Sequence, residues 1–263
     1  MYIYILQKYT NLFQKGFSFA NQNLLLFVVQ TVPALFIFFI NTSLRAPNNF
    51  LTVPQPSLFY GLINWLLQII SFGIVYTLPI FFLKRYNHGK YTIAEVIAEI
   101  VATARNLFLP LLGLLAITII FAFLNGVILN LFMKLPSLLS NVTVSFSIFT
   151  VQSIIFRILN AMLIFSPLLY KLEKLNFYPA LFDSFKLSLK HLLFIAIVLG
   201  FNYFLTLLDK FILPSPLRHY SIFMMTSYEE LLRQLFGLLI GNYLGFILTA
   251  TVFVYYKKYA ANR

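Results

Sequence analysis

Residues 108–132 read FLPLLGLLAITIIFAFLNGVILNLF, and this stretch decides the fold class. It contains no charged side chain, and its apolar residues run continuously, whereas the strands of a membrane β-barrel alternate apolar and polar residues. A helix needs about 20 apolar residues to cross the hydrocarbon core of a bilayer. The stretch therefore predicts a transmembrane helix.

Five further stretches are apolar over a similar length, and the composition of the whole chain also indicates a membrane protein. Of the 263 residues, 60% are apolar and only 10% are charged, against roughly a quarter charged in an average soluble domain. So few charged residues could not coat a soluble protein of this size. We therefore expect an all-α fold, a polytopic bundle of six transmembrane helices in a single membrane domain spanning residues 1–263. The other five predicted spans are 24–40, 58–83, 146–170, 192–213 and 231–256.

Basic residues mark one side of the membrane. Thirteen lysines and arginines lie before the first predicted span, in the second and fourth connections and after the last span, whereas the other three connections, with the span ends beside them, hold five. Because positive charge resists translocation, the side with thirteen is predicted to be the cytoplasm, with both termini on it. We expect a multi-pass protein of the plasma (inner) membrane. The thirteen are Lys8, Lys15, Lys84, Arg85, Lys90, Arg105, Lys171, Lys174, Lys186, Lys190, Lys257, Lys258 and Arg263.

The formal net charge of +12 raises the question of a nucleic-acid partner. The bases are scattered between apolar runs and form no continuous basic face, so we expect no nucleic-acid binding, with anionic lipid headgroups as the counter-charge instead.

The chain has no cysteine, which excludes disulfides, thiolate metal sites and cysteine nucleophiles. Residues 1–23 lack the pattern of a signal peptide, and we expect them to stay on the protein.

The predicted cytoplasmic segments resemble one another. Three amphipathic segments, each running into a span, align on Asn23, Asn106 and His191, at intervals of 83 and 85 residues. Each unit would comprise an interfacial elbow helix, a span, a proline-bearing outer connection, a second span and a basic exit. Duplication is one explanation; the other is that every membrane hairpin needs aromatic and basic edges. The predicted repeat units are 8–86, 91–174 and 177–259, and the aligned segments are 11–27, 94–110 and 179–195.

The elbow helices have a polar and an apolar side. Glu95 and Glu99 lie opposite the apolar face of one, and Asp183, Lys186 and Lys190 follow a favourable order on the polar side of another. Such helices are expected to lie in the headgroup plane. They are either docking surfaces for a cytoplasmic partner or lipid, or elbows that only position the spans.

This pattern resembles a group of poorly characterised six-span bacterial membrane proteins, related to the membrane domain fused to some glycerophosphodiester phosphodiesterases. The resemblance is one of pattern over most of the chain, and no phosphodiesterase domain is present. It implies a membrane-embedded accessory role or transport and offers no catalytic residues. The residues that carry it are the elbows 92–107 and 178–191 and the basic exits Lys84, Arg85, Lys171, Lys257 and Lys258.

Arg157 is the main anomaly, because it lies near the middle of the fourth predicted span. A central arginine costs at least ~2.5–3.5 kcal/mol on insertion scales, and none of the seven acids lies near the middle of a predicted span. Arg157 could bind an anionic substrate or lipid, pair with a carboxylate of another subunit, or bond to amides and backbone in a wet crevice. The candidate neighbours are Asn160, Gln152, Asn125, Asn130, Asn64 and Gln68.

The last predicted span carries glycines at Gly237, Gly241 and Gly245, a spacing that lets helix backbones approach closely. The row would pack against another span of this chain or against another subunit.

No phosphate-binding loop, metal-binding helix or nucleophile–base pair is evident, so we expect no enzyme activity, no metal and no cofactor. Two functions remain: an integral membrane accessory or scaffold subunit that docks a protein partner or lipid, and a transporter for a small anionic or amphipathic substrate.

Overall fold

The computed structural model describes residues 2–43, 58–133, 154–155, 157–212 and 228–261, and within these ranges the chain is helical, without strands. The all-α prediction is confirmed for these residues. The predicted proline-bearing outer connections lie outside them. The elements are α1 (Tyr2–Asn21), α2 (Leu24–Ser43), α3 (Leu58–Tyr86), α4 (Ile93–Met133), α6 (Ser166–Leu172), α7 (Phe177–Lys190), α8 (Leu192–Ile212), α10 (Tyr228–Tyr255) and the π-helical turn η1 (Tyr256–Ala260).

Several helices are long and apolar enough to cross a bilayer. Three single stretches meet this condition, Ile69–Tyr86, Ile93–Leu114 and Gln234–Ala260. Two pairs of helices meet it together but are bent, α1 with α2 by 81° and α7 with α8 by 102°. The described residues therefore hold three to five candidate spans, as expected of a multi-pass membrane protein.

The two bends fall at two of the three residues on which the predicted segments align. Asn23 lies between α1 and α2, and His191 lies between α7 and α8. Asn23 is buried; its side-chain amide donates to the Phe19 carbonyl (2.6 Å) and accepts from the Tyr91 hydroxyl (2.8 Å). The second segment differs, because α4 runs through the exposed Asn106 as one helix. Its elbow is therefore continuous with its predicted span.

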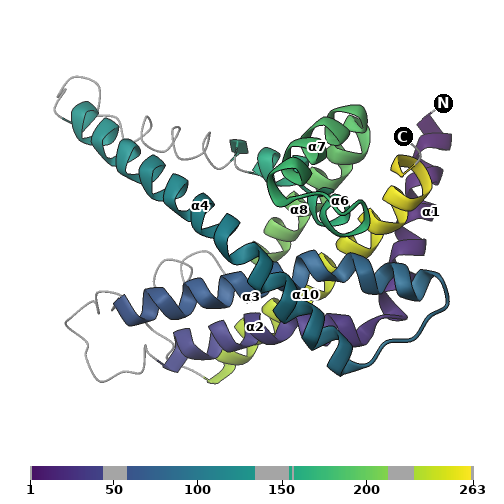
Figure 1. The fold of residues 1–263 in the computed structure, drawn as a ribbon, viewed down its shortest axis with the longest axis horizontal. Helices are drawn as coiled ribbons and strands as arrows, with labels where there is room; N and C mark the ends of the chain where they lie inside the picture. Colours follow the sequence, from purple (N-terminus) through teal and green to yellow (C-terminus); the bar gives the residue numbers. More distant parts are fainter. Residues whose placement is uncertain (1, 44–57, 134–153, 156, 213–227, 262–263) are drawn as a thin grey trace.

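The core lies where α1 crosses α10, close to α3 and α8 (Figure 1). The rings of Phe82, Phe194, Phe246 and Phe253 are fully buried there. At the crossing, a Cβ added to Gly16 would lie 2.8 Å from the Cα of Thr251, so the two backbones touch. The first elbow is thus packed against the last helix.

The fourth predicted span is broken at its end. Residues 157–162 are helical, Leu163–Phe165 form a turn, and α6 starts at Ser166. Pro167 has no N–H to continue the earlier helix, and the Ser166 N–H bonds to Leu163 instead of Met162. The carbonyl that this frees belongs to Met162. Two buried hydroxyls of α7 donate to it, from Ser184 (3.0 Å) and Ser188 (2.7 Å).

Candidate functional site

The Arg157 cluster predicted from the sequence falls only partly within the described residues. Arg157 and Asn160 lie three residues apart on the helical stretch 157–162, and both are exposed. Gln152 and the side chains of Asn125, Asn130, Asn64 and Gln68 lie outside the described residues. The role of Arg157 stays a prediction.

Two glycines of the α10 row, Gly241 and Gly245, have free space beside them where a side chain would begin. Beyond its own stretch of helix backbone, a Cβ added to Gly241 or Gly245 would meet no heavy atom of the described residues within 4 Å. Gly237 is half-buried. Whether the row contacts another subunit stays a prediction.

The basic exits of the predicted hairpins are joined by a chain of polar contacts. Lys84, at the end of α3, forms an ion pair with Glu95 near the start of α4 (2.9 Å). One turn further along α4, Glu99 pairs with Lys171 of α6 (2.8 Å), whose side chain is only 12% exposed. Directly after α6, Glu173 accepts a hydrogen bond from the hydroxyl of Tyr256 in η1. We call these six residues the tied end.

These contacts connect parts of all three predicted units. The Lys84–Glu95 pair joins the exit of the first unit to the elbow of the second unit. The Glu99–Lys171 pair joins that elbow to the exit of the second unit. The third joins the exit of the second unit to that of the third. Sequence reasoning identified these lysines as membrane anchors and the two glutamates of α4 as its polar face. It did not identify the contacts, because they depend on where α6 and η1 meet α4.

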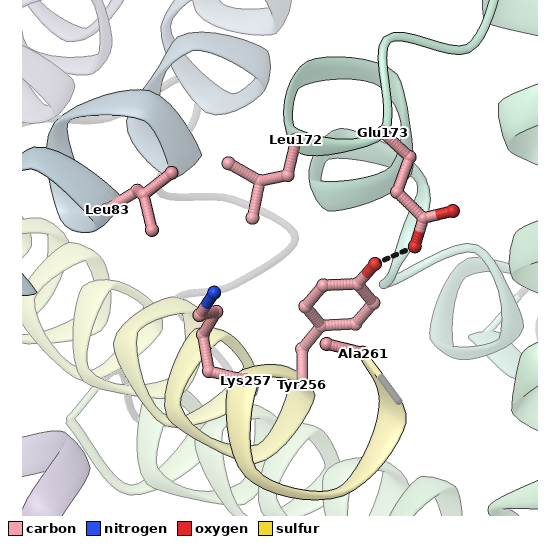
Figure 2. A pocket seen from close by; sticks show the side chains of 6 residues that line it. All are labelled: Leu83, Leu172, Glu173, Tyr256, Lys257 and Ala261. Atoms are coloured by element: carbon pink, nitrogen blue, oxygen red, sulfur yellow. Dashed lines mark hydrogen bonds between the residues drawn. The ribbon is translucent and has the colours of Figure 1, made fainter. Parts of the chain in front are cut away.

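A shallow cavity of about 310 Å³ opens at the same place. Figure 2 shows the aliphatic side chains of Leu83 and Leu172 on one side of it, with Lys257 and Tyr256 rising from η1 below. The hydrogen bond between Tyr256 and Glu173 borders it, and Ala261 completes the lining. The cavity is therefore formed by all three basic exits and has apolar, anionic and cationic walls.

A second set of contacts recurs at the junctions between elbows and spans. The Tyr91 hydroxyl bonds to Asn23, the Tyr178 hydroxyl donates to the Pro110 carbonyl (3.2 Å), and the Tyr255 hydroxyl bonds to the ring of His191 (2.9 Å). The sequence separations are 68, 68 and 64 residues. We call Tyr91, Tyr178 and Tyr255 the junction tyrosines. In the sequence they are only tyrosines close to the ends of predicted spans, and nothing there indicates these contacts.

No family model, curated protein or solved structure matches the chain.

Proposed function

We propose that this protein is an integral membrane accessory or scaffold subunit, without catalytic activity, that docks a partner protein or lipid at its basic end. The tied end is the observation that carries the proposal. Three separate exits are held to one another by two ion pairs and a hydrogen bond, so the exits form one fixed surface. A fixed surface loses little conformational entropy when a partner binds, which favours binding.

The proposed architecture is six spans in three repeated units, each with an elbow and a hairpin. The junction tyrosines support it, because their near-constant separation is what duplication of one unit would leave. The bends at Asn23 and His191, in aligned positions of the first and third units, support it as well.

We place the basic end in the cytoplasm of a plasma (inner) membrane, together with both termini. Supporting this placement, α1 and η1 pack together, with the Lys8 ammonium 4.4 Å from the centre of the Tyr259 ring. The chain therefore begins and ends on the same side of the bundle. Lysine and tyrosine together are typical of the membrane–water interface.

Purification of the tagged full-length chain in a mild detergent tests the scaffold role. We expect a partner in fixed stoichiometry, recovered reciprocally when the partner carries the tag. Glu99→Ala and Glu173→Ala together should release it, because they remove the acceptor side chains of two of the three ties. The matched double substitution Glu229→Ala and Glu230→Ala removes the same charge on the opposite side and should keep it. A monodisperse protein that carries no partner in either tagging direction contradicts the scaffold role.

Transport of a small anionic or amphipathic substrate is the second candidate, and the broken helix at Leu163–Phe165 favours it. Discontinuous spans form the substrate sites of many transporters. Arg157 lies one and a half turns before the break. If Arg157→Leu leaves uptake by whole cells unchanged for every anion tested, the transport alternative fails.

A further inference from the structure

Two ammonium groups from opposite ends of the chain flank one tyrosine ring. Lys8 Nζ of α1 lies 4.4 Å from the ring centre of Tyr259, and Lys258 Nζ of η1 lies 4.9 Å from it. Because both distances are measured to one point, the two nitrogens are no more than about 10 Å apart. Cation–π contacts with the ring offset part of their mutual repulsion.

A third cation joins them from the end of α7. Lys190 precedes His191, whose ring bonds to Tyr255 (2.9 Å), and the Tyr255 ring lies 5.1 Å from Tyr259. Burial lowers the pKa of His191, and the charges of Lys190 and Lys8 lower it further. These ring contacts place the residue after Lys190 beside the rings that Lys8 and Lys258 flank. We call Lys8, Lys190 and Lys258 the cation cluster.

Neither Lys8 nor Lys190 forms an ion pair within the described residues. Ion pairs are formed there by other lysines, among them Lys84, Lys171 and Lys186. Holding the charges of Lys8 and Lys190 at one end of the fold raises the energy of the folded chain, and an anion placed between them would lower it. A phosphate group has several acceptor oxygens and can bond to more than one ammonium group at once.

The cluster stands beside an exposed apolar surface. At the bend that follows Lys190, Leu192 and Leu193 are 57% and 53% exposed, and Leu189 precedes it with similar exposure. A free phosphate compound would gain nothing from such residues, whereas acyl chains would cover them. Tyr9, Phe194 and Tyr255 stack behind the cluster, as aromatic residues do at headgroup level.

We propose that Lys8, Lys190 and Lys258 form a binding site for the phosphate of an anionic glycerophospholipid, whose acyl chains lie along the leucines of the α7–α8 bend. The site deepens the proposed function, on which it rests, because it needs the basic end to lie at headgroup level. It assigns a specific lipid position to residues that would otherwise act only as general membrane anchors.

Native mass spectrometry of the full-length chain tests the site, in mixed micelles of phosphatidylglycerol and phosphatidylcholine. We expect the wild-type chain to retain phosphatidylglycerol preferentially. Lys8→Gln, Lys190→Gln and Lys258→Gln together should lower the phosphatidylglycerol-bound fraction at least fivefold. The matched control removes three other bases of the predicted cytoplasmic side and should change the bound fraction less than twofold. It carries Lys15→Gln, Lys90→Gln and Lys174→Gln.

Equal losses in the two triple variants overturn the proposal, because retention would then depend on total charge. Soluble glycerol phosphate at millimolar concentration should not displace the lipid; if it does, the site takes a soluble phosphate compound and the lipid assignment is wrong. If the triple variant does not fold, Lys8→Gln and Lys190→Gln singly should each lower retention at least twofold, and unchanged retention in both overturns the site. Mapping which side of the membrane the basic end occupies tests the proposed placement independently of these outcomes.

Discussion

The contact between α1 and α10 at Gly16 gives the sharpest prediction about stability. We consider Gly16→Ala and Gly16→Leu. The added Cβ would lie 2.8 Å from both Cα and Cβ of Thr251, whereas ordinary van der Waals contact begins near 3.4 Å. The neighbouring backbone cannot rotate away as a side chain can, so the two helices must separate along the crossing.

The magnitude follows from two opposing terms. Overpacking of this kind costs about 1–3 kcal/mol, and replacing a helical glycine by alanine recovers about 1 kcal/mol. We expect Gly16→Ala to lower the free energy of unfolding by about 1 kcal/mol. Gly16→Leu should lower it by about 3 kcal/mol, because its longer side chain also has to be placed. At roughly 2–4 °C per kcal/mol for a chain of this size, Tm falls by a few degrees and by about 6–12 °C, respectively.

Thermal unfolding in detergent, followed by fluorescence-detected size exclusion, measures both shifts. The matched control is Gly241→Ala in α10, where a Cβ meets nothing within 4 Å of it, and its Tm should stay equal or rise. Thr251→Ala should not rescue Gly16→Ala fully, because the Cα and Cβ of residue 251 remain in place. A Gly16→Ala protein as stable as Gly241→Ala would refute the close crossing of α1 and α10.

Three further sets of substitutions test other contacts by the same measurement of thermal stability. Ser184→Ala and Ser188→Ala should each cost little alone, because the other hydroxyl still serves their shared carbonyl. Together they should cost about 1–3 kcal/mol more than the sum of the single losses, and strict additivity would show that the carbonyl does not depend on them. Glu99→Gln should cost more than Glu95→Gln, whose ion pair is exposed and worth about 0–1 kcal/mol; equal losses would contradict the difference in burial. Because the pKa of His191 is lowered in the fold, the unfolded chain takes up a proton first as pH falls below about 6.5, so stability present above that pH should decline in acid. His191→Gln should flatten this decline, and an unchanged pH slope would exclude the histidine as its source.

The helices were predictable, because uninterrupted apolar runs have few other stable forms in lipid. The bends were predictable only in part, although Asn23 and Asn106 align. Asn23 is buried and bonded on both sides of its amide, so it holds a change of direction, whereas Asn106 is exposed and α4 continues through it. An alignment records residue type but not burial.

The break in the fourth predicted span had a sequence signal, Pro167, which was not decisive. Pro33, Pro79 and Pro110 all lie within continuous helices. At Pro167 the freed carbonyl has two partners from another helix, and a proline breaks a buried helix at low cost only where such partners are in place. The tied end was also unpredictable, because it too depends on partners that other helices supply. Its lysines and glutamates were visible in the sequence, but their pairing depends on tertiary contacts.

Site-directed labelling with a membrane-impermeant maleimide tests the central claim directly, because the chain has no cysteine of its own. Single cysteines would replace Asn49, Ser137 and Ser215 in the predicted outer connections, and Asn87 and Asn176 beside the basic exits. In intact cells we predict labelling of the first three, and labelling of Asn87→Cys and Asn176→Cys only after permeabilisation. Labelling of either exit position in intact cells, together with the outer positions, would contradict the arrangement of three hairpins with one basic side.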